Sequence, residues 1–113
     1  MKNILFLGSK PLGEKAFEYI LENLDFNNYS IPCVSSNSNS DNVWWGTNKI
    51  YEKTQELDID FVPMDNKNFS LLENKIIEHE IDMIVSVQYN WIIPDYILKM
   101  VDYQAVNLHN AKL

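Results

Sequence analysis

The chain has 113 residues, of which 46% are hydrophobic and 12% aromatic, and it carries a formal net charge of -7. This composition excludes an intrinsically disordered chain and suffices for one small domain with its own core. The sequence contains no arginine, and nucleic-acid binding relies on Lys and Arg to neutralise phosphates. The charge balance therefore argues against a DNA or tRNA partner and favours a small-molecule substrate.

The sequence shows no recognisable targeting signal and no metal-binding motif. Cys33 is the single cysteine and lies in an apolar stretch, so we expect a buried structural thiol. The spacing of Cys and His is not typical of zinc, and no metal site is expected. No segment approaches the ~20 apolar residues of a membrane span, and the run Ile4–Leu7 is too short for a signal-peptide core. The sequence predicts a cytoplasmic protein with no membrane partner.

In chain order, the first half begins with a short apolar run, Met1–Gly8, which predicts a buried strand ending in glycine. A helix follows from the Gly13 turn, and Tyr29–Ser35 predicts a second strand. The polar stretch 36–42 indicates a loop, and helix formers return at Asn48–Leu57. The first helix places five apolar residues on one face: Ala16, Phe17, Ile20, Leu21 and Leu24.

The second half repeats this alternation. Asp60–Pro63 predicts a short third strand closed by its proline, and Phe69–His79 predicts a helix with Leu72, Ile76 and Ile77 facing inward. Ile81–Val87 is the clearest buried strand. Pro94–Val101 predicts a short helix that could open with proline in its first turn, and Ala105–Leu108 predicts a fifth strand.

Strands that alternate with helices of this length predict right-handed crossovers and a parallel sheet. The strands are almost wholly apolar, as expected when helices cover both faces of the sheet. We therefore expect one α/β domain with a Rossmann-like parallel sheet. Ligands of such sheets bind beyond the carboxyl ends of the strands, and three features of this sequence fall there.

The first feature is the turn Gly8–Gly13, which leads from the first strand into the first helix. Backbone N–H groups at such a helix start can hold an anion, and Ser9 and Lys10 are candidate substrate residues, with Lys10 able to reach a phosphate. The glycine spacing matches neither the dinucleotide fingerprint nor a P-loop. A tight turn without a ligand explains the pattern equally well.

The second feature is the loop Gln88–Ile93 after the fourth strand, which mixes two aromatic residues, two isoleucines and two amides. A flat heterocycle would be held by such apolar walls and by the backbone groups of a loop. A cap over the core, formed by Trp91 and Ile92, is an equally good interpretation.

Trp44 and Trp45, in the first half of the chain, could stack on a nucleobase or cover a substrate, although adjacent tryptophans more often anchor a long loop.

The third feature is the pair Asn107 and His109 at the end of the fifth strand. Residues two apart in a strand point to the same face. Both side chains can therefore converge on one reacting atom, with His109 as proton acceptor and Asn107 as hydrogen-bond donor.

These features together resemble the N-terminal half of the formyltransferases that use N10-formyltetrahydrofolate. The resemblance is carried by Ile4–Ser9, by Asp82–Pro94 and by the Asn107-x-His109 motif, and it covers essentially the whole chain in element order. It implies that Asn107 and His109 are catalytic. It also implies that the loop after the fourth strand holds the pterin ring, through Val87, Tyr89, Asn90, Trp91, Ile92 and Ile93.

The resemblance further implies direct formyl transfer from the folate to a primary amine. Asn107 and a protonated His109 would stabilise the oxyanion that forms when the amine attacks the formyl carbon. His109 could alternatively accept the proton that the amine loses.

Two departures from the family pattern bear on the substrate and on the extent of the domain. The family carries a catalytic Asp further along, which these 113 residues lack, so we expect a domain truncated after the fifth strand and inactive by itself. Where the family often has His-x-Ser-Leu-Leu-Pro, this chain has His109-Asn110-Ala111. That pairing is closer to the branch that formylates nucleotide-linked amino sugars for bacterial surface polysaccharides such as the lipopolysaccharide O-antigen.

Three alternatives remain open from the sequence. The acceptor could instead be glycinamide ribonucleotide or initiator methionyl-tRNA, although the acidic balance disfavours the latter. The chain could also be a non-catalytic, flavodoxin-like binding module. A homodimer is compatible with the sequence but is not predicted by any feature of it.

Overall fold

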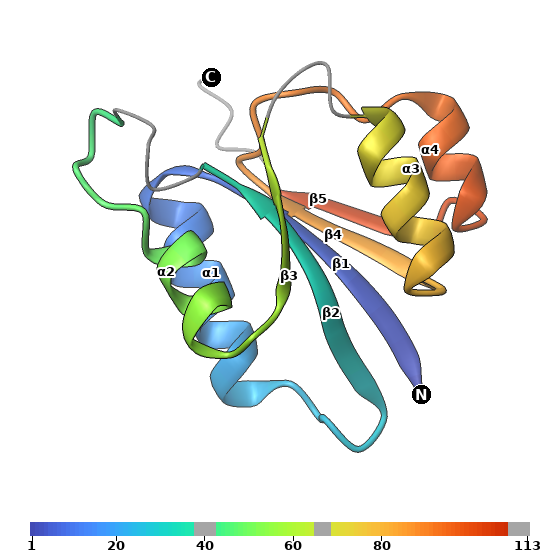
Figure 1. Ribbon diagram of the computed structural model, residues 1–113, viewed down its shortest axis with the longest axis horizontal. Helices are drawn as coiled ribbons and strands as arrows, with labels where there is room; N and C mark the ends of the chain where they lie inside the picture. The colour runs from blue at the N-terminus through green and yellow to red at the C-terminus, as the bar shows by residue number, and fades with distance from the viewer. Residues whose placement is uncertain (38–42, 65–68, 109–113) are drawn as a thin grey trace.

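Five parallel strands form a single sheet in the computed structural model, which describes residues 1–37, 43–64 and 69–108 (Figure 1). The strands are β1 (Lys2–Gly8), β2 (Tyr29–Ser36), β3 (Asp60–Pro63), β4 (Met83–Val87) and β5 (Ala105–Leu108). Their spatial order is β3-β2-β1-β4-β5, and every neighbouring pair is parallel. The direction in which the sheet grows therefore reverses between β1 and β4, the point at which open α/β sheets bind ligands.

Helices cover both faces of this sheet. Figure 1 shows α1 (Lys10–Asn23) and α2 (Lys49–Glu56) on one face, and α3 (Phe69–Glu78) and α4 (Asp95–Met100) on the other. The predicted Rossmann-like α/β fold is thus confirmed. None of the helices in the described ranges is long and apolar enough to cross a membrane.

The central strand β1 shows why the sheet is buried on both sides. Ile4 and Phe6 pack with Phe17 under α1 and α2, whereas Leu5 and Leu7 pack into a second cluster under α3 and α4. This division follows from the period-2 alternation of side chains along a strand. An apolar residue at each of these positions is therefore required by the position of β1 in the middle of the sheet.

An irregularity interrupts the pairing of β1 with β2. Asn3 pairs with Ser30 and Leu5 with Cys33, so that β2 contains one more residue than β1 over this interval. The extra residue falls at Ile31-Pro32, and a proline without an N–H donor is tolerated inside a sheet at such a bulge. The bulge allows Ile31 and Val34 to pack on the α1 face while Cys33 packs on the α3 face.

The start of α1 lies close to β4 because residue 13 is a glycine. A Cβ atom at this position would lie 3.0 Å from the Val87 carbonyl oxygen and 3.3 Å from the Gly8 carbonyl carbon. The Gly13 N–H also donates to the Ser9 carbonyl at 3.0 Å. The predicted turn Gly8–Gly13 is shorter than expected, because α1 already begins at Lys10, and the glycine in its first turn permits the close approach of helix and sheet.

Three details of the predicted elements need correction. Ile77 was expected to face inward but is 65% exposed, since Leu72 and Ile76 already supply the buried side of α3. Pro94 precedes α4 as its N-cap residue rather than lying in the first turn. Strand β4 begins at Met83, because Asp82 instead pairs with the Asn3 backbone.

Candidate functional site

The loop that follows β4 begins with a sharp change of direction at Gln88. This residue has a φ angle of 56°, in the left-handed region that residues other than glycine rarely adopt. Its N–H donates to the Leu108 carbonyl at 3.0 Å, so that β4 and β5 stay joined one residue beyond β4. The left-handed residue turns the following four residues across the carboxyl ends of the sheet.

A pocket of about 400 Å³ lies between this loop and β5. This volume falls within the range of about 300–1,000 Å³ that is usual for small-molecule sites. The predicted residues that line it are Tyr89, Asn90, Trp91, Ile92, Ile93 and Asn107. Further lining residues are Ile84, Ser86, Leu98, Tyr103, Ala105 and Val106.

The apolar wall of the pocket is formed by side chains that are partly open to solvent. Trp91 is 38% exposed and Ile92 is 91% exposed, while Ile93 is half-buried. Exposure of large apolar side chains at a pocket is typical of a surface that a ligand covers. Of the two interpretations of the loop, a cap over the core is thus excluded for Ile92.

Tyr89 differs from its neighbours in the loop. Its side chain is only 4% exposed and belongs to the hydrophobic core, and its hydroxyl forms a 2.8 Å hydrogen bond with Ser35 Oγ in β2. Tyr89 therefore contributes one edge to the pocket and chiefly anchors the loop to the sheet.

Asn107 lies on β5 opposite Ser86 on β4, and both line the pocket. Adjacent residues in paired parallel strands have side chains on the same face of the sheet. Ser86 was not predicted as a site residue, although a serine inside the apolar run Ile84-Val85-Ser86-Val87 is a signal that could have indicated it. His109 falls outside the described residues.

Tyr103 adds a further polar group to the pocket wall. Its hydroxyl lies 3.2 Å from both carboxylate oxygens of Asp95 in the first turn of α4. Desolvation and the hydrogen bond to Asp95 raise the pKa of the Tyr103 hydroxyl, which donates to the Asp95 carboxylate.

The remaining predicted residues do not line this pocket. Val87 is 4% exposed and packs on the α1 face of the sheet, and only its carbonyl oxygen faces the turn, accepting the Ser9 N–H at 3.1 Å. Ser9 is 1% exposed, with its hydroxyl 2.6 Å from Asn37 Oδ1. Lys10 begins α1 with a φ angle of 64°.

The two adjacent tryptophans pack against each other with ring centroids 5.2 Å apart and an interplanar angle of 84°. Trp44 is 78% exposed, whereas the indole nitrogen of Trp45 is buried and has no hydrogen-bond partner among the described residues. Neither ring lines the pocket beside Asn107. The prediction of a substrate contact for Trp44 and Trp45 stays a prediction.

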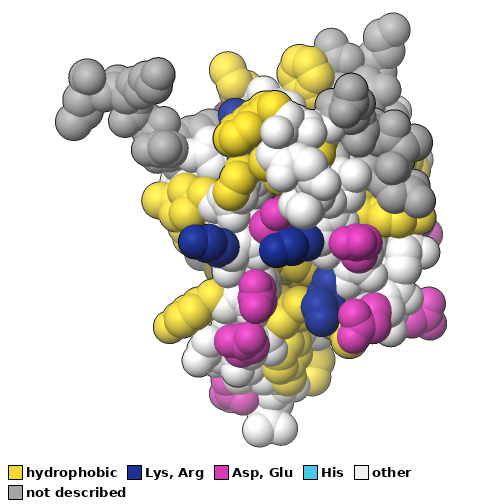
Figure 2. All heavy atoms as spheres, turned by 90° about the vertical axis from the view of Figure 1, so that its left-hand side faces the viewer, with side chains coloured by type: hydrophobic (Ala, Val, Ile, Leu, Met, Phe, Trp, Pro, Cys, Tyr) yellow, Lys and Arg dark blue, Asp and Glu magenta, His cyan; other side chains and the backbone are white. Residues whose placement is uncertain are grey.

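A larger hollow of about 830 Å³ lies elsewhere, between α1 and α2. Lysine and acidic side chains are interspersed with hydrophobic ones across this face of the molecule (Figure 2). None of the predicted site residues lines it. The smaller pocket at the carboxyl ends of β4 and β5 is therefore the candidate functional site.

The comparisons with known proteins point to one structural group. No protein-family model and no curated protein matches the chain. Among solved structures, a glycinamide ribonucleotide transformylase from Geobacillus kaustophilus is similar to all of the chain, with a TM-score of 0.73 and 16% identity, over 60% of its own length. The similarity establishes the fold.

Other solved structures of this group agree. A phosphoribosylglycinamide formyltransferase from Anaplasma phagocytophilum covers 94% of the chain with a TM-score of 0.70 and 17% identity, over 48% of its own length. A formyltetrahydrofolate deformylase from Pseudomonas syringae covers 99% of the chain with a TM-score of 0.68 and 21% identity, over 37% of its length. The chain thus spans about half the length of the formyltransferases that it resembles.

Proposed function

We propose that this chain forms the N-terminal part of a catalytic domain that transfers a formyl group from N10-formyltetrahydrofolate to the amine of a nucleotide-linked amino sugar. The observation that carries the proposal is the position of Asn107 in the wall of an apolar pocket at the carboxyl ends of β4 and β5. The names of the solved structures of the same fold, which are formyltransferases and a folate deformylase, support the same chemistry.

The residues of the pocket fit a folate donor. Trp91, Ile92 and Ile93 offer apolar area to a flat ring, and the loop backbone offers polar groups to its edge. The side-chain nitrogen of Gln88 is buried and has no hydrogen-bond partner in the described part of the chain. Gln88 is not among the residues that line the pocket, so the fit to a folate rests on the loop residues.

The role of Asn107 follows from the charge that develops during transfer. The acceptor amine attacks the formyl carbon and forms the new C–N bond, while the bond from that carbon to N10 of the folate breaks. The amine loses a proton, N10 gains one, and the formyl oxygen carries negative charge in between. The Asn107 side-chain N–H groups are donors for that oxygen, and His109 is the proposed acid and base.

The first test is calorimetric titration of the chain with 5-formyltetrahydrofolate, a stable relative of the donor. Saturable binding is expected for the wild type, and Ile92→Asp is expected to weaken it about tenfold or more, since a charge would replace an apolar contact of roughly 1–3 kcal/mol. Ile92 is 91% exposed, so this substitution spares the core, unlike any change at Tyr89.

Ile77→Asp is the matched control, because Ile77 is also exposed but lies on α3 and does not line the pocket. In a protein that is active, Asn107→Ala is expected to retain folate binding. It is expected to lower the transfer of a labelled formyl group to the acceptor amine about 10²–10³-fold. A folded chain that does not bind the folate, or an Ile92→Asp variant that binds as the wild type does, would contradict the proposal.

Glycinamide ribonucleotide is the second candidate acceptor, favoured by the names of the structures with the same fold. The His109-Asn110-Ala111 sequence favours the amino sugar. In a protein that is active, offering both acceptors at equal concentration with labelled donor distinguishes them, because only one is expected to take up the label.

A further inference from the structure

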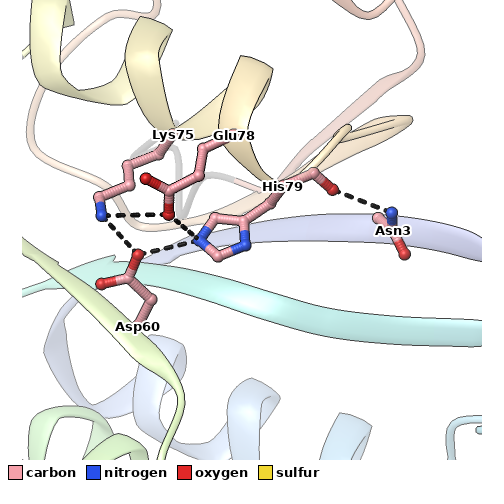
Figure 3. A network of polar contacts seen from close by, with 5 residues as sticks. All are labelled: Asn3, Asp60, Lys75, Glu78 and His79. Carbon is pink, nitrogen blue, oxygen red and sulfur yellow. Dashed lines mark hydrogen bonds and ion pairs between the residues drawn. The ribbon is translucent and has the colours of Figure 1, made fainter.

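A cluster of charged side chains joins α3 to the sheet, away from the candidate functional site. Figure 3 shows Lys75 and His79 pointing from α3 and its end toward Asp60 on β3. Asp60 Oδ2 lies 2.6 Å from Lys75 Nζ and 2.9 Å from His79 Nε2. Glu78 Oε2 lies 3.1 Å from the same His79 nitrogen.

A buried thiol lies next to these charged side chains. Cys33 is fully buried on β2 and is the direct register partner of Asp60. Its Sγ atom, a carboxylate oxygen of Asp60 and a ring nitrogen of His79 all lie within 4.8 Å of one another. Within the described ranges, no other group of three such side chains shares this property.

We propose that Cys33, Asp60 and His79 form a binding site for a zinc ion. A thiolate, an imidazole and a carboxylate are the three ligand types that Zn²⁺ selects, at about 2.0–2.3 Å from the ion. Tetrahedral ligands at those lengths are separated by roughly 3.5 Å, so the three donors need to close by about 1 Å. Rotation of the Asp60 and His79 side chains, which are 32% and 22% exposed, supplies that movement.

The backbone around the cluster is fixed in advance. The bulge at Ile31-Pro32 turns Cys33 toward the α3 face. The Asn3 side-chain amide donates to the His79 carbonyl at 2.9 Å, and the Asn3 side-chain oxygen accepts the Ser30 hydroxyl at 2.7 Å. These hydrogen bonds hold the backbone at the end of α3 in place and leave the His79 ring able to rotate toward the ion.

Lys75 occupies the cluster in the absence of a metal ion. Its ammonium group lies 2.6 Å from Asp60 and 3.5 Å from Glu78, and therefore supplies the positive charge that both carboxylates need. A zinc ion takes over that role by displacing Lys75, whose side chain can turn to solvent. Glu78 or a water molecule provides the fourth ligand, and the Cys33 thiol proton leaves to solvent when Sγ coordinates the ion.

The site is structural, since it ties α3 to β2 and β3 and does not include Asn107 or the loop after β4. Binding that is confined to the folded state stabilises that state in proportion to the logarithm of the ion concentration. We therefore expect zinc to raise the midpoint of thermal unfolding without changing the affinity for folate.

The test uses cobalt as a spectroscopic substitute for zinc. The metal-free chain is titrated with Co²⁺, and a thiolate-to-cobalt charge-transfer band is expected, together with the intense visible bands of a four-coordinate ion. Cys33→Ser is expected to abolish the charge-transfer band, and His79→Gln to weaken binding at least about tenfold. Added Zn²⁺ should displace the cobalt and bleach both sets of bands.

Lys75→Met gives the sharpest distinction, because it removes the competing charge. Cobalt affinity is expected to increase about tenfold or more in this variant. Lys53→Met is the matched control, since it removes another i,i+3 lysine–glutamate ion pair, with Glu56 on α2, and should leave the affinity unchanged. A folded wild type without a charge-transfer band would show that the cluster is an ion-pair network only. A band unaffected by His79→Gln would show that His79 is not a ligand and would overturn the proposed three-residue site.

Discussion

At the scale of single residues, Cys33 shows how burial controls ionisation. Desolvation, reinforced by the negative charge of Asp60, raises the pKa of its thiol from 9.0 to about 12. In the folded state the thiol thus stays neutral at pH values at which the thiol of the unfolded chain is ionised. By linkage, the stability that this difference contributes is complete below pH 9.0 and is lost as the pH rises toward about 12.

We therefore expect wild-type stability to fall with alkaline pH more steeply than that of Cys33→Ala. One unit above the unfolded pKa, the extra loss is about 1.4 kcal/mol. Urea unfolding of both proteins in the presence of a chelator, at neutral pH and at the alkaline pH, measures it. The tyrosines and lysines titrate in both proteins and cancel in the comparison. Parallel pH profiles would contradict the assigned burial of the thiol.

The residues of the two sites differ in how far the sequence could predict them. The burial of Cys33 is confirmed. Asn107 and the loop residues Asn90–Ile93 line one pocket, while their catalytic and pterin-binding roles stay predictions. Tyr89, predicted to help hold a pterin, lines the pocket and also anchors the loop through Ser35. This anchor could not be predicted, because a hydroxyl partner on a distant strand has no local signal. The cluster of Cys33, Asp60 and His79 could not be predicted either, since its members lie on β2, on β3 and just after α3.

At the scale of elements, α2 depends on α1 for its first turn. Asn48 occupies the N-cap position but makes no capping hydrogen bond through its side chain. The Glu14 carboxylate of α1 accepts the Lys49 N–H at 2.9 Å instead, together with the Thr47 hydroxyl at 2.8 Å. A carboxylate at a helix N-terminus also interacts favourably with the helix dipole.

Glu14→Ala is therefore expected to lower the free energy of unfolding by about 1 kcal/mol, the usual cost of a lost cap. Glu18→Ala is the control, because Glu18 lies one turn further along α1, is exposed and lines the same hollow. Denaturant unfolding should separate the two variants. Equal stabilities would mean that the contact between α1 and the start of α2 contributes nothing.

Element types and order were predictable because their hydrophobic periods are unambiguous. The bounds of β1, α2, β3 and β5 agree with the predicted ones to within one residue at each end. Ile77 was assigned to the wrong face of α3, because the sequence shows apolar character at residues 76 and 77 without indicating which one the sheet covers. The bulge at Pro32 could not be anticipated either, since it is defined only by the pairing with β1.

At the scale of the whole molecule, protection from solvent decreases from the centre of the sheet outward. Leu5, Phe6 and Leu7 of β1 are fully buried, whereas all four residues of β5 are exposed. Native-state hydrogen exchange is expected to be slowest in β1 and to be faster in β5 by several orders of magnitude, because local opening costs less where few apolar contacts are broken. Mass spectrometry of exchanging peptides measures this gradient, and uniform protection across the sheet would contradict it.

The central position of β1 also has a consequence for folding during translation. Its two neighbours are synthesised at very different times, because β2 begins at Tyr29 whereas β4 begins only at Met83. At the usual rate of about 5–20 residues per second, one edge of β1 waits for several seconds without a partner. Ile4–Leu7 is then an exposed apolar edge on a nascent chain. Among the described strands, β1 thus has the edge that waits through the longest interval for its partner strand.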